Sequence, residues 1–133
     1  MRQPNLAFEA KIIKRFVIEP KQERFLAFLK NDRTRRKFTE VLSQVNVFKE
    51  ELFERIDGDE REVIRARIEG LNVQSCYVIS ENEEIDQHRF DIETALKTVI
   101  SPWSDTGTVI VFGGGEVVYL ECEGMKNKWI SRV

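Results

Sequence analysis

The sequence predicts an α+β fold in which a mostly helical N-terminal half packs on a small, mainly antiparallel sheet from the C-terminal half. Up to about residue 71 the apolar residues recur at helical spacing, and beyond it they form β-branched and aromatic runs. The second half therefore follows the order β-α-β-β-β. No Pro/Ser-rich linker lies near Gly70, so we expect a single domain over residues 1–133, helical over about 1–71 and sheet-forming over about 72–133.

The first segment, residues 7–18, fits either a strand or a helix. Its alternate positions are mostly apolar, as in a strand, but Ile12 and Phe16 also share a helical face. We favour the strand, because the segment runs almost directly into Pro20.

Three helices are predicted between Pro20 and Gly58. Pro20 suits the first turn of the first one, which we expect to end near Asn31. The apolar face of the second helix is formed by Phe38, Val41, Leu42 and Val45. A shorter third helix has an apolar face formed by Phe48, Leu52, Phe53 and Ile56.

Capping residues mark two further helices. Asp59 and Glu62 have the spacing of a capping box, and Gly70 is placed to end the helix that they begin. Asp91 is placed to cap an amphipathic helix over residues 92–100. The fourth and fifth helices are therefore the ones with the clearest starts.

Strands are predicted at residues 73–80, 108–112, 116–123 and 128–133, and Gly113–Gly115 separate the middle two. The glycines do not match a dinucleotide-binding loop, because Val118 stands where G-x-G-x-x-G requires its third glycine. We interpret them as a hairpin turn between an interior strand and a half-exposed one.

Composition excludes several classes of protein. A net charge of -2 gives no overall attraction to DNA or to anionic membranes. The first 20 residues carry charges that no signal peptide has in its apolar region, and no uncharged stretch is long enough to span a bilayer. Two cysteines, Cys76 and Cys122, form no disulfide framework, so we expect a cytoplasmic protein without membrane association.

The strongest candidate for a binding site is the basic run formed by Arg33, Arg35, Arg36 and Lys37. It falls at the start of a predicted helix, where positive charge opposes the helix dipole and a bound anion would relieve the conflict. Two alternatives remain: acidic side chains of the same chain meet these residues, or the helix continues from the preceding one. No aromatic residue is interleaved in the run, which disfavours stacking on single-stranded nucleic acid.

A second candidate is the acidic loop that precedes the Asp91 helix. It offers hard oxygen ligands and the only histidine of the chain, in the residues Glu81, Glu83, Glu84, Asp86 and His88. The spacing matches no metal-binding motif, and we predict no metal and no cofactor.

Nothing in the sequence assembles a catalytic motif. Cys76 and Cys122 lie within predicted strands, where cysteines are usually buried, and a pairing of either with His88 depends on the fold. We therefore expect a non-catalytic module that binds a protein partner through its two oppositely charged segments. A nucleic-acid or phosphate binder using Arg33–Lys37 is the alternative, and an enzyme or metal site at the Glu81–His88 loop is a more distant one.

Overall fold

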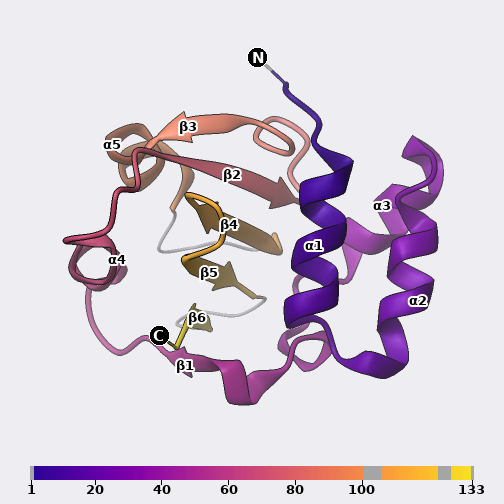
Figure 1. Cartoon of the computed structure of the whole chain (residues 1–133), viewed down its shortest axis with the longest axis horizontal. Helices are drawn as coiled ribbons and strands as arrows, with labels where there is room; N and C mark the ends of the chain where they lie inside the picture. Colours follow the sequence, from indigo (N-terminus) through magenta and orange to yellow (C-terminus); the bar gives the residue numbers. More distant parts are fainter. Residues whose placement is uncertain (1, 101–105, 123–126, 133) are drawn as a thin grey trace.

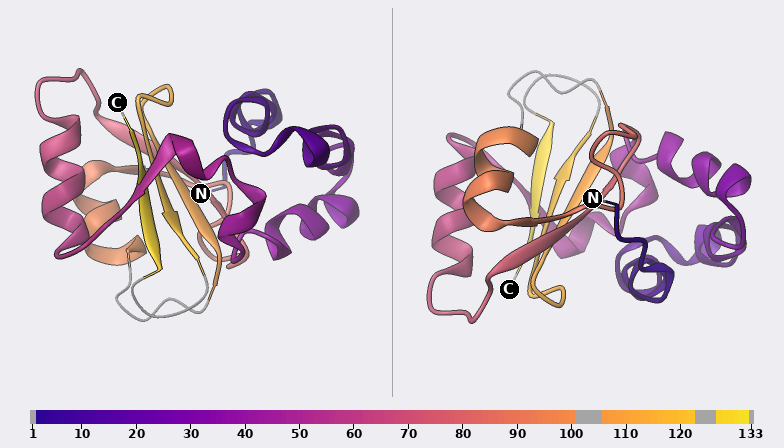
Figure 2. Two further views of the ribbon diagram at one scale, coloured as in Figure 1. Left: turned by 90° about the horizontal axis from the view of Figure 1, so that it is seen from below. Right: turned by 90° about the horizontal axis from the view of Figure 1, so that it is seen from above.

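The computed structural model describes residues 2–100, 106–122 and 127–132, and it has helices on both sides of one six-stranded antiparallel sheet (Figures 1 and 2). The strand order is β1-β6-β5-β4-β2-β3. The strands are β1 (Phe53–Arg55), β2 (Ser75–Ser80), β3 (Arg89–Asp91), β4 (Thr108–Phe112), β5 (Val117–Glu121) and β6 (Lys128–Ser131). The helices are α1 (Leu6–Phe16), α2 (Glu19–Phe28), α3 (Asp32–Glu40), α4 (Glu60–Ile68) and α5 (Ile92–Thr94), which continues as a π-helical turn over Ala95–Val99. The predicted α+β class is confirmed.

The two helical layers explain why the central strands are apolar on both faces. Helices α1, α2 and α3 cover one face, and α4 and α5 cover the other (Figure 2). In β5, Val118 and Leu120 pack toward the first layer, whereas Val117 and Tyr119 pack toward the second. The prediction that this strand is half-exposed is therefore wrong, because a second helical layer buries the face that the sequence pattern assigns to solvent.

The segment predicted as a strand at residues 7–18 is a helix, α1. The side chain of Asn5 accepts a hydrogen bond of 3.1 Å from the Phe8 amide, which caps its start. Its buried residues lie at helical spacing and face the sheet; they are Glu9, Ile12, Ile13 and Phe16. Pro20 does lie in the first turn of α2, as predicted.

The short helix predicted around Phe53 is also wrong. Two 3-10 turns, Val45–Val47 and Glu50–Leu52, lead into β1, which pairs with β6 and closes one edge of the sheet. The edge of β6 supplies hydrogen-bonding partners that no local pattern reveals. The sheet therefore takes one of its strands from the N-terminal half of the chain.

The predicted N-caps Asp59 and Asp91 are confirmed, but among the described residues Glu62 makes no hydrogen bond that would complete the capping box. Asp59 accepts a hydrogen bond of 2.9 Å from the Arg61 amide, and Gly70 has the positive φ of 82° that suits the end of α4. Asp91 accepts one of 3.2 Å from the Thr94 amide at the start of α5.

The hairpin turn at Gly113–Gly115 is confirmed as well. Strands β4 and β5 pair directly up to Phe112 and Val117, and Gly113 and Gly115 have φ values of 64° and 107°. The side chain of Arg15 donates a hydrogen bond of 2.8 Å to the Gly115 carbonyl, so α1 holds the turn against the sheet. The described parts of the other predicted strands match β2 and β6, while Glu123 and Val133 lie outside the described residues.

The two cysteines belong to different cores. Cys76 packs in the core under α4 and α5, and Cys122 packs in the core under α1, α2 and α3. Both are free thiols on opposite faces of the sheet, which keeps them apart. Within the described part of the chain, no helix has the length and apolar character needed to cross a membrane.

Candidate functional site

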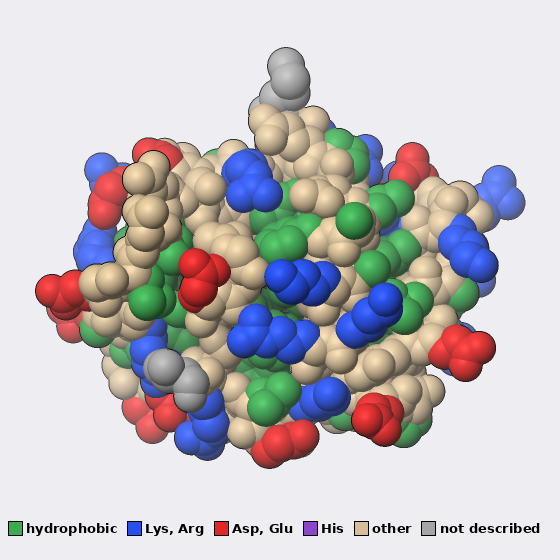
Figure 3. All heavy atoms as spheres, viewed as in Figure 1, with side chains coloured by type: hydrophobic (Ala, Val, Ile, Leu, Met, Phe, Trp, Pro, Cys, Tyr) green, Lys and Arg blue, Asp and Glu red, His purple; other side chains and the backbone are tan. Residues whose placement is uncertain are grey.

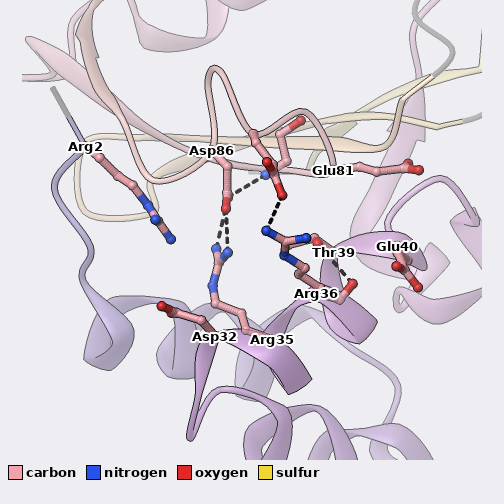
Figure 4. Close-up of a pocket in the computed structure, with 10 residues that line it drawn as sticks. Arg2, Asp32, Arg35, Arg36, Thr39, Glu40, Glu81 and Asp86 are labelled. Atoms are coloured by element: carbon pink, nitrogen blue, oxygen red, sulfur yellow. Dashed lines mark hydrogen bonds and ion pairs between the residues drawn. The ribbon is translucent and has the colours of Figure 1, made fainter.

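The two charged segments singled out in the sequence face each other across one cleft. The basic start of α3 forms one wall, and the loop between β2 and β3 forms the other (Figure 4). The cleft has a volume of about 410 Å³, and Arg2 reaches it from the N-terminal segment. Its charged lining residues are Arg2, Asp32, Arg35, Arg36, Glu40, Glu81, Glu83 and Asp86.

Arg35 forms the floor of the cleft and is only 4% exposed. Its guanidinium donates to both carboxylate oxygens of Glu9, at 2.8 and 3.1 Å, and to both oxygens of Asp86, at 2.5 and 3.0 Å. Burial alone would lower the pKa of Arg35, but the hydrogen bonds to Asp86 and Glu9 outweigh it and raise that pKa. Arg35 is therefore a permanent cation that holds α1, α3 and the β2–β3 loop together.

Glu9 is fully buried and accepts two further hydrogen bonds. The Tyr77 hydroxyl donates at 2.6 Å and the Gln87 amide at 3.1 Å, both to the same carboxylate oxygen. Burial, followed by this bond to Glu9, raises the pKa of Tyr77. Because Asp86 also accepts a bond of 3.0 Å from the Ser80 amide, both carboxylates are well satisfied inside the protein.

Gln87 occupies an unusual backbone position beside this cluster. It is 1% exposed, and its φ of 60° is the only positive value at a non-glycine residue among the described residues. The N-terminal segment holds it in place: Arg2 donates to its side chain at 2.8 Å, and the Gln3 amide donates to its carbonyl at 2.7 Å. The surrounding hydrogen bonds thus maintain a conformation that a glutamine rarely adopts.

Arg36 and Glu83 form the rim of the cleft. Their ion pair of 2.7 Å joins α3 to the β2–β3 loop, and both side chains are 70% exposed. Of the four basic residues predicted as an anion site, Arg35 and Arg36 are therefore paired with acidic groups of the same chain. This geometry agrees with the first alternative drawn from the sequence.

The other two basic residues, Arg33 and Lys37, are exposed. The Lys37 ammonium lies 6.0 Å from the centre of the Phe28 ring, and Arg24 lies 5.4 Å from the same ring. Phe28 is the last residue of α2 and lies five positions before Arg33, outside the run itself, so the absence of an aromatic residue within the run gives no sign of this ring.

The remaining residues of the acidic loop point to different surroundings and do not meet at one site. Glu81 accepts a hydrogen bond of 3.2 Å from the Gly107 amide, and Glu84 is exposed. The His88 ring contacts the Asp86 carbonyl through Nδ1 at 3.0 Å and stacks on Phe90. Among the residues that the structure describes, no three His, Cys, Asp or Glu side chains come together as a metal site would require.

The two cysteines considered as nucleophiles in the sequence, and the hydroxyl of Ser80, are poorly placed for catalysis. Burial raises the pKa of Cys76 to about 12 and that of Cys122 to about 12, so both thiols are protonated at neutral pH. The Ser80 hydroxyl lies 2.8 Å from the Thr108 hydroxyl, and His88 is held by Asp86 and Phe90. Neither cysteine is thus activated by the histidine.

A second buried ionic cluster lies on the other side of the sheet, and no sequence pattern indicated it. Lys128 donates to Glu60 at 2.6 Å and lies 3.8 Å from Glu121, which accepts a hydrogen bond of 2.8 Å from Tyr119. Burial and the nearby Glu121 charge raise the pKa of Tyr119. The cluster ties α4 to β5 and β6.

Comparisons with models of protein families, with curated proteins and with solved structures find no match to this chain.

Proposed function

We propose that this protein is a non-catalytic module that binds another protein at the cleft between α3 and the β2–β3 loop. The observation that carries the proposal is the exposed Arg36–Glu83 pair above the buried Arg35 cluster. The rim presents one positive and one negative group on a rigid floor. The partner recognised by such a rim carries an acidic and a basic side chain of its own.

The different burial of the two pairs gives each a separate role. An exposed ion pair contributes about 0.2–1 kcal/mol to stability, so Arg36 and Glu83 separate at little cost when a partner offers each of them a new counter-charge. Arg35 does not exchange in this way, because releasing it would leave Glu9 and Asp86 buried without their cation. The floor therefore keeps its shape while the rim changes partners.

The arrangement of these side chains favours binding rather than catalysis. We also propose that the protein is cytosolic. The cysteine and histidine side chains needed for a nucleophilic mechanism do not converge. The proposed cytosolic location rests on the sequence, which has two cysteines and no disulfide framework. Opposite charges across an interface fix register and speed association, which suits a regulatory module.

Exchanging the two rim charges tests the proposal. The double variant Arg36→Glu/Glu83→Arg keeps an internal ion pair but inverts the charges that a partner meets. Affinity capture from the native cytosol, quantified by mass spectrometry, should recover a defined protein with the wild type and lose it with this variant. The matched control is Arg65→Glu/Glu93→Arg, because this exposed pair of 2.9 Å joins α4 to α5 on the other side of the sheet.

The control variant should capture the same protein as the wild type. Equal recovery with all three proteins would rule out the cleft as the binding site. Loss of recovery with both variants would point to a general effect of charge exchange and would also count against the proposal.

A further inference from the structure

The charges of this protein are divided unequally along the chain. The first 40 residues hold 11 of the 21 basic residues but only five of the 23 acidic ones, so they carry a net charge of about +6 and the remainder about -8. The overall value of -2 hides this division. A basic segment within an acidic protein is a feature of chains that bind an anionic polymer locally.

The fold keeps this basic segment together as one layer. Helices α1, α2 and α3 lie on the same side of the sheet (Figure 2), and Lys and Arg side chains spread over the face where α1 and α2 lie, with hydrophobic side chains between them (Figures 1 and 3). The only acidic residue of α1, Glu9, is fully buried against Arg35 and adds no negative charge to this surface.

Phe28, at the end of α2, is the aromatic residue of this surface. It is partly exposed, and its ring stacks on Phe25 at 6.1 Å. Its carbonyl accepts a hydrogen bond of 2.8 Å from the Thr34 hydroxyl, which joins the end of α2 to the first turn of α3. Phe25 in turn packs on Phe38, so the ring is mounted on a fixed support.

Two exposed cations lie over this ring, and two more lie nearby in the chain. Arg24 and Lys37 lie over it, and Lys30 and Arg33 lie on either side of the turn that Thr34 closes. None of the four forms an ion pair with another residue that the structure describes. Their charges are therefore available to an external anion.

We propose that this surface, formed by Arg24, Phe28, Lys30, Arg33 and Lys37, binds single-stranded nucleic acid. The four cations contact successive phosphates, and Phe28 with the Arg24 guanidinium provides a platform on which a base stacks. A partly exposed aromatic ring flanked by cations favours a nucleic acid over an acidic protein segment, because carboxylates gain nothing from a stacking platform. The site is separate from the α3–loop cleft and does not depend on the proposed protein partner.

Fluorescence anisotropy with a labelled thymidine oligonucleotide of about twelve residues tests the proposal. With three or four phosphate contacts, the logarithm of the binding constant should fall with the logarithm of salt with a slope of about -2 to -3. Arg24→Glu/Lys37→Glu should abolish most of the binding. Phe28→Leu keeps an apolar side chain beside Phe25 and should weaken binding about tenfold, as expected for the loss of one stacked base.

Three controls separate this site from general charge effects. Arg65→Glu/Lys97→Glu removes the same charge from the opposite helical layer and should bind the oligonucleotide like the wild type. Arg36→Glu/Glu83→Arg should also bind normally, which distinguishes this proposal from the protein-binding cleft. Thermal melting checks that each variant is folded.

Several outcomes would overturn the proposal. These are no binding at about 20 mM salt, unchanged affinity of Phe28→Leu, or an equal loss with the Arg65→Glu/Lys97→Glu control. Competition by poly-glutamate as effective as by unlabelled oligonucleotide would instead assign the surface to acidic proteins.

Discussion

Arg35 and Asp86 lie 51 positions apart in the chain, yet they share two hydrogen bonds inside the protein. One comes from the basic run at the start of α3, and the other from the acidic loop after β2. The same guanidinium also binds Glu9 of α1 in bidentate fashion. Arg35 and Asp86, which belong to the two charged segments of the sequence, thus stabilise the fold. The exposed charged residues around them are the ones that we propose for recognition.

Replacing Arg35 should destabilise the protein strongly. Arg35→Met leaves the Glu9 and Asp86 carboxylates buried without their cation, which costs about 3–5 kcal/mol. Urea denaturation followed by circular dichroism measures the loss. Arg36→Met is the matched control, because its exposed pair with Glu83 should contribute less than about 1 kcal/mol. Equal losses for the two variants would contradict the role assigned to Arg35.

Both tyrosines should resist ionisation in the folded protein. The chain contains two, Tyr77 and Tyr119, and burial raises the pKa of each. In the unfolded chain a tyrosine has a pKa of about 10, so above that pH proton loss favours unfolding and stability decreases. Phenolate absorbance during an alkaline titration should therefore appear together with the loss of circular dichroism. A phenolate signal from protein that is still folded would contradict this prediction.

The cysteines should be inert until the protein unfolds. Burial raises the pKa of Cys76 and that of Cys122 to about 12, and the two lie on opposite faces of the sheet. A thiol reagent at pH 8 should label neither in the native protein and both in urea, and oxidation should form no internal disulfide. Rapid labelling of the native protein would contradict this prediction and would show that β2, or the chain just after β5, opens.

Gly107 should tolerate no side chain. A Cβ atom there would collide with backbone atoms of Leu42 and Ser43. A flexible side chain could move away from the new methyl group, but these backbone atoms cannot. Gly107→Ala should therefore cost about 3 kcal/mol in the free energy of unfolding. Gly114→Ala is the control, because the nearest atom is a carboxylate oxygen of Glu116 at 3.3 Å, and it should change stability by about 0.5 kcal/mol or less.

The sequence was sufficient wherever local chemistry decides the structure. Asp59 and Asp91 cap helices as predicted, and Gly113 and Gly115 provide the positive φ values of a hairpin turn. These features depend on residues within a few positions of one another, so a single sequence contains the information.

The predicted secondary structure was wrong where contacts between distant segments of the chain decide it. Residues 7–18 carry both periodicities, and the helix forms because its apolar face finds the sheet. Phe53 lies in a strand because β6 offers it an edge. The candidate site shows the same limit. Both charged segments were identified, and contact of the basic run with acidic groups of the chain was one alternative, but the sequence did not say which acidic residues meet it. The buried partners Glu9, Tyr77 and Gln87 give no signal in the pattern of charges.

The hydrogen bonds from Arg2 and Gln3 to Gln87 have a practical consequence for experiments. An affinity tag fused ahead of Arg2 would be anchored beside the cleft and would pull on the backbone of Gln87 whenever it is bound to a resin. A tag placed after β6, which ends at Ser131 and lies next to β1, the edge strand opposite β3, leaves these contacts untouched. Immobilisation through the C-terminal side is therefore the appropriate geometry for capturing partners of this protein.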